Sequence, residues 1–430
     1  MRVGIITVGS RGDVQPYIAL GAGFRRAGHE VRLLTHGLFA EEVRAADLDF
    51  ADIGVDPRSV IEQLMGQEGA GGRATVVRQV LFMRRVLREV DPLLHDMVRR
   101  AWQATEDVNA LLLSPLTVFA GIPLARKRHT RAFGAYVQPI SPTAEFPSVL
   151  FPQLPAWVGP LRPLYNRLSA ELVEQLRWPL YRSVVRAAHA DLGTPLRSPL
   201  AQMRRARTPI CYGYSPSLLP RPADWPAYCH VTGYWFLDTP ADWQPQAELR
   251  AFLDAGPPPV YVGFGSMATR DPAGLTEVVV QALARTGQRG ILLKGWGAIV
   301  PERLPETILA IDFVPHDWLF PRVAAVVHHG GAGTTSAGLR AGRPSLIVPF
   351  IGDQAFWGRQ VYERGLGPRP LEKDRLSIAA LTEAITAMLT DQAMRDRAAA
   401  MGEQIRAEDG PANVVRVVEQ HVRPSEPQWP

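Results

Sequence analysis

The chain of 430 residues contains only two cysteines, Cys211 and Cys229, and only three lysines. Two thiols are too few for a disulfide framework or for a four-thiolate zinc site, so both kinds of protein are excluded. Arginine therefore carries nearly all of the basic charge, which favours contacts with phosphates and carboxylates. Because the net charge is only +5 and no basic stripe is visible, binding to nucleic acid or another polyanion is not expected.

Long uncharged runs are also scarce. The longest, at 108–125, is interrupted by an asparagine and two prolines, which suits buried segments joined by a turn rather than a membrane span. The first residues reach an arginine and an aspartate too soon for a secretory signal. We therefore expect a cytoplasmic protein with at most peripheral membrane contact. Two arginine-rich amphipathic stretches, 73–100 and 162–186, could provide such contact, although ordinary solvated helices produce the same pattern.

Short apolar runs recur in both halves of the chain, the first of them bounded by glycine, and predict parallel strands buried on both faces. The expected strands lie at 3–8, 31–35, 50–53, 111–114, 132–136 and 231–234, and then at 260–264, 290–294, 308–313, 324–328 and 345–348. Helical patterns alternate with them, as in doubly wound α/β sheets. A stretch rich in proline and tryptophan, 215–259, separates the halves. We expect α/β domains at 1–222 and 223–400, and a helix at 401–422 that crosses back to the first domain.

The most informative segment is HHGGAGTT at 328–335, between an expected buried strand and an expected helix. Glycines let backbone N–H groups approach a ligand closely, and a helix N-terminus adds unpaired donors and partial positive charge, so a diphosphate suits this segment. The pattern is neither a P-loop nor the G-x-G-x-x-G of dehydrogenases. A tight turn without a ligand is the alternative. Because neighbouring residues on a turn point in different directions, one histidine can face a ligand while the other packs.

Two further segments follow expected strands in the second half. Asp353 and Gln354 place a carboxylate beside an amide, which suits sugar hydroxyls, although Asp353 could instead cap a helix. The segment 312–319 contains Phe313, whose ring could hold a flat base or belong to the core. Since ligands of open α/β sheets bind at the carboxyl ends of the strands, both segments are candidates for a binding site.

These three segments, in this order, resemble the nucleotide-sugar signature of the UDP-glycosyltransferase superfamily with the GT-B fold. PHDWLF, VVHHGGAGTT, GLRAG and VPFIGDQAFWG are most similar to the sterol 3β-glucosyltransferase branch and to bacterial antibiotic glycosyltransferases, and GSRGDVQPYIALG, GFGSM and KGWG extend the similarity. The resemblance implies two Rossmann-like parallel-sheet domains that face each other across a cleft. It also implies that the first domain binds an acceptor and the second a nucleotide sugar.

The resemblance also implies roles for individual residues. The donor-binding residues are His329, Gly331, Gly333, Thr334 and Ser266 at the diphosphate, Phe313 and Val314 at the base, and Asp353 and Gln354 at the sugar hydroxyls. Phe313 stands where much of the superfamily has tryptophan.

The loop at 9–16, GSRGDVQP, contains no histidine, although many family members use one there as the base. As in the antibiotic branch, Asp13 is then the expected base. Its alternative is a structural one, because an aspartate shortly before Pro16 could be the N-cap of a helix. A helix N-terminus would favour the ionised carboxylate, so Asp13 would be a weak base that acts late in the reaction.

We therefore expect an inverting, metal-independent glycosyltransferase that moves a hexose, in the first place glucose from UDP-glucose, to a hydroxyl of a hydrophobic small-molecule acceptor such as a sterol or polyketide-like aglycone. The nucleotide sugar is a co-substrate, and no cofactor is expected. The D-x-D sequence at 47–49 mimics a metal-binding motif but precedes a strand in a variable region. Two alternatives stay open: an antibiotic-tailoring enzyme that uses a dTDP-deoxysugar, and a non-catalytic lipid- or nucleotide-binding protein on the same scaffold.

Overall fold

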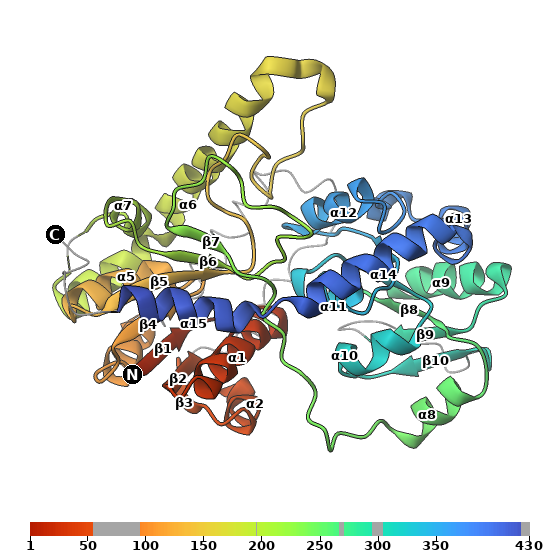
Figure 1. The fold of residues 1–430 in the computed structure, drawn as a ribbon, viewed down its shortest axis with the longest axis horizontal. Helices are drawn as coiled ribbons and strands as arrows, with labels where there is room; N and C mark the ends of the chain where they lie inside the picture. Colours follow the sequence, from red (N-terminus) through yellow and green to blue (C-terminus); the bar gives the residue numbers. More distant parts are fainter. Residues whose placement is uncertain (55–94, 195, 266–270, 295–303, 423–430) are drawn as a thin grey trace.

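The computed structural model describes residues 1–54, 95–194, 196–265, 271–294 and 304–422. Within these residues the chain forms two parallel sheets, one in each half, as the apolar runs predicted (Figure 1). None of the described helices has the length and apolar character that a membrane crossing requires.

The first sheet has seven strands in the order β3-β2-β1-β4-β5-β6-β7, and all neighbouring pairs are parallel. Its strands are β1 (Arg2–Ile6), β2 (Glu30–Thr35), β3 (Asp49–Asp52), β4 (Ala110–Leu113), β5 (Arg131–Tyr136), β6 (Ile210–Tyr212) and β7 (Cys229–Val231). The accompanying helices are α1 (Arg11–Arg26), α2 (Ala40–Ala45), a helix at 95–104, α5 (Val118–Lys127), α6 (Arg162–Leu192) and α7 (Pro199–Arg205). Since β7 pairs with β6, the first sheet continues past the boundary expected between 222 and 223.

The second sheet has five strands in the order β10-β9-β8-β11-β12, again all parallel. Its strands are β8 (Val260–Gly263), β9 (Gly290–Leu293), β10 (Ile308–Ile311), β11 (Ala325–His328) and β12 (Ser345–Ile347). The helices are α8 (Ala247–Asp254), α9 (Pro272–Thr286), α10 (His316–Leu319), α11 (Ala332–Arg340), α12 (Gln354–Glu363), α13 (Ile378–Thr390), α14 (Gln392–Ala407) and α15 (Gly410–His421).

In both sheets the strand order reverses direction beside the first strand of the half. The reversal lies between β1 and β4 in the first sheet and between β8 and β11 in the second. Connections leave such a switch point in opposite directions, which opens a crevice outside the carboxyl ends of the strands. The loop from β1 to α1 and the loop from β11 to α11 both begin at these positions, so topology alone directs the two sequence motifs to the binding edges of their sheets.

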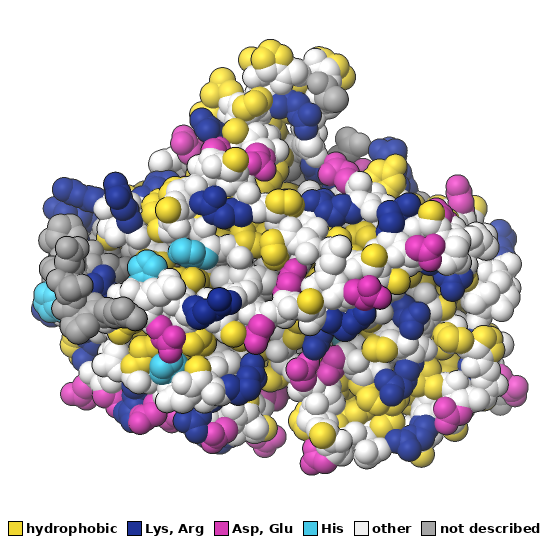
Figure 2. Space-filling model, in the orientation of Figure 1, with side chains coloured by type: hydrophobic (Ala, Val, Ile, Leu, Met, Phe, Trp, Pro, Cys, Tyr) yellow, Lys and Arg dark blue, Asp and Glu magenta, His cyan; other side chains and the backbone are white. Residues whose placement is uncertain are grey.

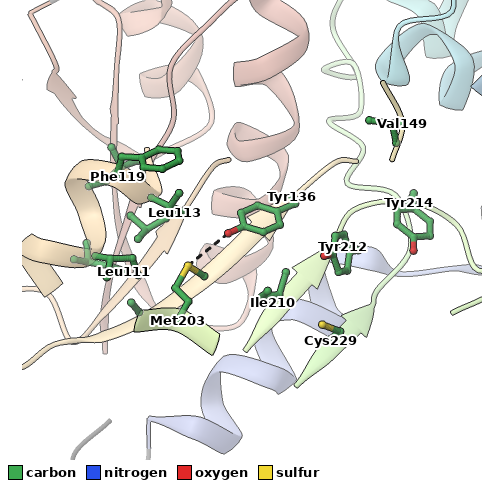
Figure 3. Packing of buried hydrophobic residues seen from close by; sticks show 14 of the residues in the cluster. Leu111, Leu113, Phe119, Tyr136, Val149, Met203, Ile210, Tyr212, Tyr214 and Cys229 are labelled. Carbon is green, nitrogen blue, oxygen red and sulfur yellow. Dashed lines mark hydrogen bonds between the residues drawn. The ribbon is translucent and has the colours of Figure 1, made fainter. Parts of the chain in front are cut away.

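The core of the first domain is rich in aromatic and aliphatic side chains that pack against one another (Figure 3). Tyr136 on β5 is buried, and its hydroxyl donates to Met203 Sδ on α7 at 3.7 Å. The same apolar cluster continues into the second domain, where Trp357 of α12 is 1% exposed and lies against Tyr214. Burial of a large aromatic ring contributes strongly to packing, so this continuity stabilises the relative position of the two domains.

The tail is not the single helix that the sequence predicted at 401–422. Helix α14 ends at Ala407, and α15 begins at Gly410 after Asp409, whose carboxylate accepts a hydrogen bond from Ala412 N–H at 3.0 Å. Figure 1 shows the chain passing from α14 on the second domain to α15 on the first. A Cβ added to Gly23 of α1 would lie 2.5 Å from Pro411 Cβ, so a glycine permits the close approach of α15 to α1.

Candidate active site

Asp13 lies in the first turn of α1, directly after β1. The helix begins at Arg11 with Ser10 as its N-cap residue, so the alternative in which Asp13 is the N-cap is wrong. Asp13 Oδ2 instead accepts hydrogen bonds from the Ser10 N–H and the Ser10 hydroxyl, both at 2.9 Å. The Thr7 hydroxyl donates to the Asp13 carbonyl at 2.8 Å. These bonds hold the carboxylate in one position over the loop.

Burial raises the pKa of Asp13 above its usual value, and the two hydrogen bonds from Ser10 oppose that rise. The sequence suggested that the helix N-terminus would make Asp13 a weak base. Desolvation outweighs that stabilisation of the ionised form, because little water reaches the carboxylate. Asp13 is therefore more basic than its position on the helix alone implied.

Ser10→Ala is expected to move the acidic limb of the pH–rate profile to higher pH. The Ser10 hydroxyl stabilises ionised Asp13, so its removal leaves the desolvation of the carboxylate less opposed and raises the pKa further. A reaction that needs the ionised carboxylate slows as the pH falls through that pKa. The measurement is kcat/KM against pH for both proteins. A limb that stays in place or moves to lower pH would show that Asp13 is not the titrating group.

No role was expected for His36 from its place in the sequence. It is buried at the end of β2, and its Nε2 accepts a hydrogen bond from Gly9 N–H at 2.9 Å. Gly9 has a φ of 132°, and a Cβ there would lie 2.5 Å from Asp13 Oδ2. His36 thus fixes the path of the loop that carries Asp13. No local pattern could have revealed this contact, since the two residues are 27 positions apart.

The paired histidines at the end of β11 lie in different environments, as the sequence predicted. His328 is fully buried, and its Nδ1 accepts a hydrogen bond from Gly330 N–H at 3.0 Å. The ring of His329 is nearly perpendicular to that of His328, at 89°. Burial lowers the pKa of His329 to about 4, opposed by a hydrogen bond to the backbone of Gly263. His329 is therefore a neutral imidazole at physiological pH.

Helix α11 begins immediately after these histidines. Gly331 is its N-cap residue and no side chain caps it, so the first N–H groups of the helix have no partner within the helix. A Cβ on Gly331 would lie 2.5 Å from His329 Nε2, and a Cβ on Gly330 would lie 2.6 Å from Ile347 Cγ2. The fold itself therefore requires glycine at Gly330, whereas a side chain at Gly331 would displace the His329 ring.

Gly333 differs from these two glycines, because a Cβ there would meet nothing within 4 Å. Only a ligand would then require glycine at this position. We expect Gly333→Ala to raise the free energy of unfolding by about 0.5–1 kcal/mol, since alanine is the better helix former, and yet to weaken UDP binding. Denaturant unfolding and calorimetric titration with UDP measure the two effects.

Gly331→Ala is the matched comparison, because its Cβ would displace the His329 ring. This variant is expected to lose stability as well as UDP affinity. Unchanged UDP affinity in Gly333→Ala would place the nucleotide away from the start of α11.

Asp353 and Gln354 begin α12 but have different surroundings. Asp353 is the N-cap residue of α12, yet its side chain makes no cap hydrogen bond. Its Oδ2 accepts from the Trp357 indole N–H at 2.8 Å, and Gln138 of the first domain donates a hydrogen bond to the same carboxylate. Burial raises the pKa of Asp353. Gln354 is 5% exposed, and its Oε1 accepts from Phe350 N–H, so this oxygen is directed into its own loop.

Phe313 and Val314 follow β10. The Phe313 side chain is 49% exposed, and the guanidinium of Arg11 lies over its ring, 4.3 Å from the centroid. Arg11 belongs to the first turn of α1, close to Asp13, so this cation–π contact joins the two domains. Val314 is 9% exposed and packs in the core of the second domain. The two adjacent residues therefore do not share one open surface.

Titratable side chains of the two domains lie close enough to affect one another's pKa. The charge of Asp13 contributes to the raised pKa of Asp353, after burial as the main cause. His316 on α10 has its pKa lowered to about 4, mainly by burial, which Asp317 opposes and the charge of Arg11 reinforces. Loops that follow β1, β10, β11 and β12 thus converge on one region.

Two further predictions concern residues elsewhere. Ser266 lies outside the described residues. Asp47 and Asp49 of the D-x-D sequence form ion pairs with Arg25 and Arg32. Within the described part of the chain, no group of three or more His, Cys, Asp or Glu side chains is arranged to hold a metal ion.

Comparison with known proteins identifies the family of the chain. Residues 3–96 match the glycosyltransferase family 28 N-terminal domain, and residues 291–421 match the erythromycin biosynthesis protein CIII-like C-terminal domain. A sterol 3-beta-glucosyltransferase of Arabidopsis thaliana, UGT80B1, is 33% identical over 436 residues, covering 99% of this chain and 69% of the relative. The chain belongs to the glycosyltransferase family of the sterol 3-beta-glucosyltransferases. A second Arabidopsis member, UGT80A2, is 36% identical to this glycosyltransferase over 428 residues, with 98% of this chain and 66% of the relative covered.

The chain spans about two thirds of the length of these plant relatives. It spans 30% of the sterol 3-beta-glucosyltransferase of Emericella nidulans, to which it is 34% identical over 97% of its own length.

Solved structures show the same fold at lower identity. The glycosyltransferase of kitacinnamycin superimposes with a TM-score of 0.71 at 18% identity, covering 100% of this chain and 99% of that one. The calicheamicin glycosyltransferase gives 0.66 at 20% identity, with 98% and 99% covered. A Streptomyces glycosyltransferase complexed with thymidine diphosphate gives 0.64 at 21% identity, with 98% and 99% covered. The glycosyltransferase therefore has the GT-B fold.

Proposed function

We propose that this glycosyltransferase moves a hexose, in the first place glucose from UDP-glucose, to the hydroxyl of a hydrophobic acceptor with inversion at the anomeric carbon. The observation that carries the proposal is the convergence of Asp13 from the first domain with Asp353 and the Arg11–Phe313 contact at the second. A nucleophile-activating carboxylate and a donor-binding edge are the two parts that such a transfer needs. The relatives named as sterol 3-beta-glucosyltransferases support glucose and a sterol-like acceptor.

The donor half of the site would hold the diphosphate at the start of α11. Its first N–H groups can donate hydrogen bonds to phosphate oxygens. The neutral imidazole of His329 has one N–H, which can donate to a phosphate oxygen in place of its hydrogen bond to the Gly263 backbone. A neutral imidazole supplies a directed donor without requiring a charged ring in a desolvated position. As UDP departs, negative charge grows on its phosphate oxygens, and fixed donors stabilise that charge most strongly in the transition state.

The acceptor half would use Asp13 as general base. The acceptor oxygen attacks the anomeric carbon from the face opposite the leaving UDP, a new C–O bond forms, and the bond to the phosphate oxygen breaks. The hydroxyl proton passes to Asp13 as the acceptor oxygen becomes acidic. The raised pKa of Asp13 favours this transfer, and the Ser10 hydrogen bonds orient the carboxylate.

The decisive experiment is incubation with UDP-glucose and a panel of lipophilic alcohols, including a sterol and an aromatic polyketide, with detection of the glycoside by mass spectrometry. A β-linked product from the α-linked donor supports inversion. Glycoside formed from a dTDP-deoxysugar but not from UDP-glucose would favour the antibiotic-tailoring alternative, which the thymidine diphosphate complex of a structural neighbour also suggests. Binding of UDP without transfer or hydrolysis would favour a non-catalytic binding protein.

A further inference from the structure

A projecting end of the first domain carries a concentrated group of exposed large hydrophobic side chains. Five of the eleven such side chains among the described residues lie within one stretch of sixteen residues. They are Trp157 (85% exposed), Leu161 (60%), Leu164 (56%), Leu168 (51%) and Leu172 (48%), and together we name them the apolar tip. Figure 1 shows the start of α6 extending away from the body of the molecule, and Figure 2 shows hydrophobic side chains gathered over it at the top of the view. Such a cluster on a soluble domain indicates an interaction surface.

The tip comprises Trp157, in the short 3-10 helix that precedes α6, and leucines that follow one face of the otherwise anchored α6. Its leucines are spaced by three and four residues, which places them on the same side of the helix. The opposite side is packed: Asn166 donates to the Ala144 carbonyl at 2.7 Å, and Ser169 Oγ accepts from Ser148 N–H at 2.9 Å. Further along the leucine face come Arg182 and Arg186, both exposed.

The charge around the tip favours an anionic surface. Residues 146–170 contain Arg162 and Arg167 and no acidic residue, and one exposed acidic side chain, Glu171, lies beside Leu172 of the tip. Arg167 pairs with Asp224 at 2.9 Å, and no ion pair is formed by Arg162 among the residues that the structure describes. A tryptophan and leucines flanked by arginine match the interfacial region of a bilayer, in which rings and aliphatic chains enter the acyl boundary while guanidinium groups remain at the headgroups.

The base of the projection is fixed to the helix that begins at the candidate donor site. Phe146 packs edge-on against Phe356 of α12, with ring centroids 5.5 Å apart. Arg359 of the same helix donates to Gln153 Oε1 at 2.6 Å. Helix α12 starts at Gln354, in the candidate donor site. A surface that binds the tip would therefore hold the donor site at a fixed position relative to itself.

We propose that the apolar tip docks this glycosyltransferase on membrane surfaces that contain anionic lipids. Docking itself is independent of the reaction. The benefit of docking to the enzyme rests on the proposed function, because a hydrophobic acceptor dissolves in the bilayer and would reach the cleft from there.

Vesicle sedimentation tests the docking. The full chain is mixed with vesicles of phosphatidylcholine and phosphatidylglycerol, and in parallel with vesicles of phosphatidylcholine alone. We expect wild type to bind the mixed vesicles and Leu164→Gln/Leu168→Gln to bind at least about tenfold more weakly, because two leucines no longer leave water. The matched control is Leu196→Gln/Tyr362→Gln, which changes two exposed side chains outside the tip and should bind as wild type does. Trp157→Gln, at the most exposed position, is the second variant and guards against a folding defect.

Absence of vesicle binding by wild type, or equal binding by the tip variants, would overturn the proposal. So would sedimentation velocity that shows a wild-type dimer and a monomeric tip variant, since the tip would then bind a second copy. Glucosyl transfer to a water-soluble alcohol does not need membrane docking, so its rate should be equal in wild type and in the tip variants. This measurement separates the docking from the proposed function. If no protein transfers glucose to any acceptor while wild type still binds vesicles, the proposed function fails and the docking stands.

Discussion

Asp13→Asn is expected to lower the rate of glycosyl transfer by about 10²–10⁴-fold, the usual contribution of a positioned general base. Asparagine keeps the size and shape of the side chain, and its Oδ1 can accept the hydrogen bonds that Ser10 donates. It cannot take the proton of the acceptor hydroxyl. UDP affinity should stay within a factor of about two, because the substituted residue lies in the acceptor half and changes neither α11 nor His329.

The same substitution should leave the protein at least as stable as wild type at neutral pH. The pKa of Asp13 is raised in the folded protein, so its contribution to stability is present below the unfolded pKa and is lost as the pH rises through the folded pKa. At neutral pH the buried charge therefore has a cost that asparagine removes. If Asp13 served only to stabilise the helix start, the variant would instead unfold at lower temperature and transfer would be retained.

Steady-state transfer, UDP titration and thermal unfolding together decide between these roles. Asp47→Asn is a suitable control, because Asp47 is an exposed aspartate paired with Arg25 outside the region where the loops converge. It should leave transfer unchanged. Turnover of Asp13→Asn close to that of the control would remove Asp13 from the role of base.

His329→Ala is expected to lower kcat/KM by about 10²–10³-fold, the effect of removing one preorganised donor at a developing negative charge. UDP affinity should fall by about tenfold or more, because a hydrogen bond to a charged group contributes about 1.5–3 kcal/mol. Since burial lowers the pKa of His329 to about 4, its ring is neutral throughout the physiological range. No limb of the pH–rate profile above pH 6 should therefore belong to it.

His328→Ala provides the matched control for this experiment. His328 is fully buried and holds the Gly330 N–H, so its loss leaves a cavity and an unpaired donor. We expect it to lower the free energy of unfolding by about 2–4 kcal/mol, far more than His329→Ala. Isothermal calorimetry with UDP and denaturant unfolding distinguish the two variants. Normal UDP affinity in His329→Ala would separate this residue from the diphosphate.

The sequence determined the two parallel sheets and the position of each motif on them. Apolar runs such as Ala110–Leu113 are buried along their whole length, and this property follows from the residue types alone. A strand followed by glycines and a helix places His329 at the carboxyl edge of its sheet, because every parallel βα unit has the same polarity. The order of these units then predicted two α/β domains, and the resemblance to GT-B glycosyltransferases implied that their binding edges face each other.

Only the tertiary structure decided how the residues of the site are held. The hydrogen bond from Gln138 to Asp353 and the stacking of Arg11 on Phe313 join different domains, and no periodicity within either segment refers to the other. The break between α14 and α15 arises where the chain crosses between domains.

The pKa of Asp13 is the clearest property of the site that the tertiary structure decided and the local sequence did not. A local pattern identifies a carboxylate at the start of a helix, where the backbone favours its charge. Burial by distant parts of the chain reverses that preference, since desolvation depends on everything that surrounds the group and not on its neighbours in sequence.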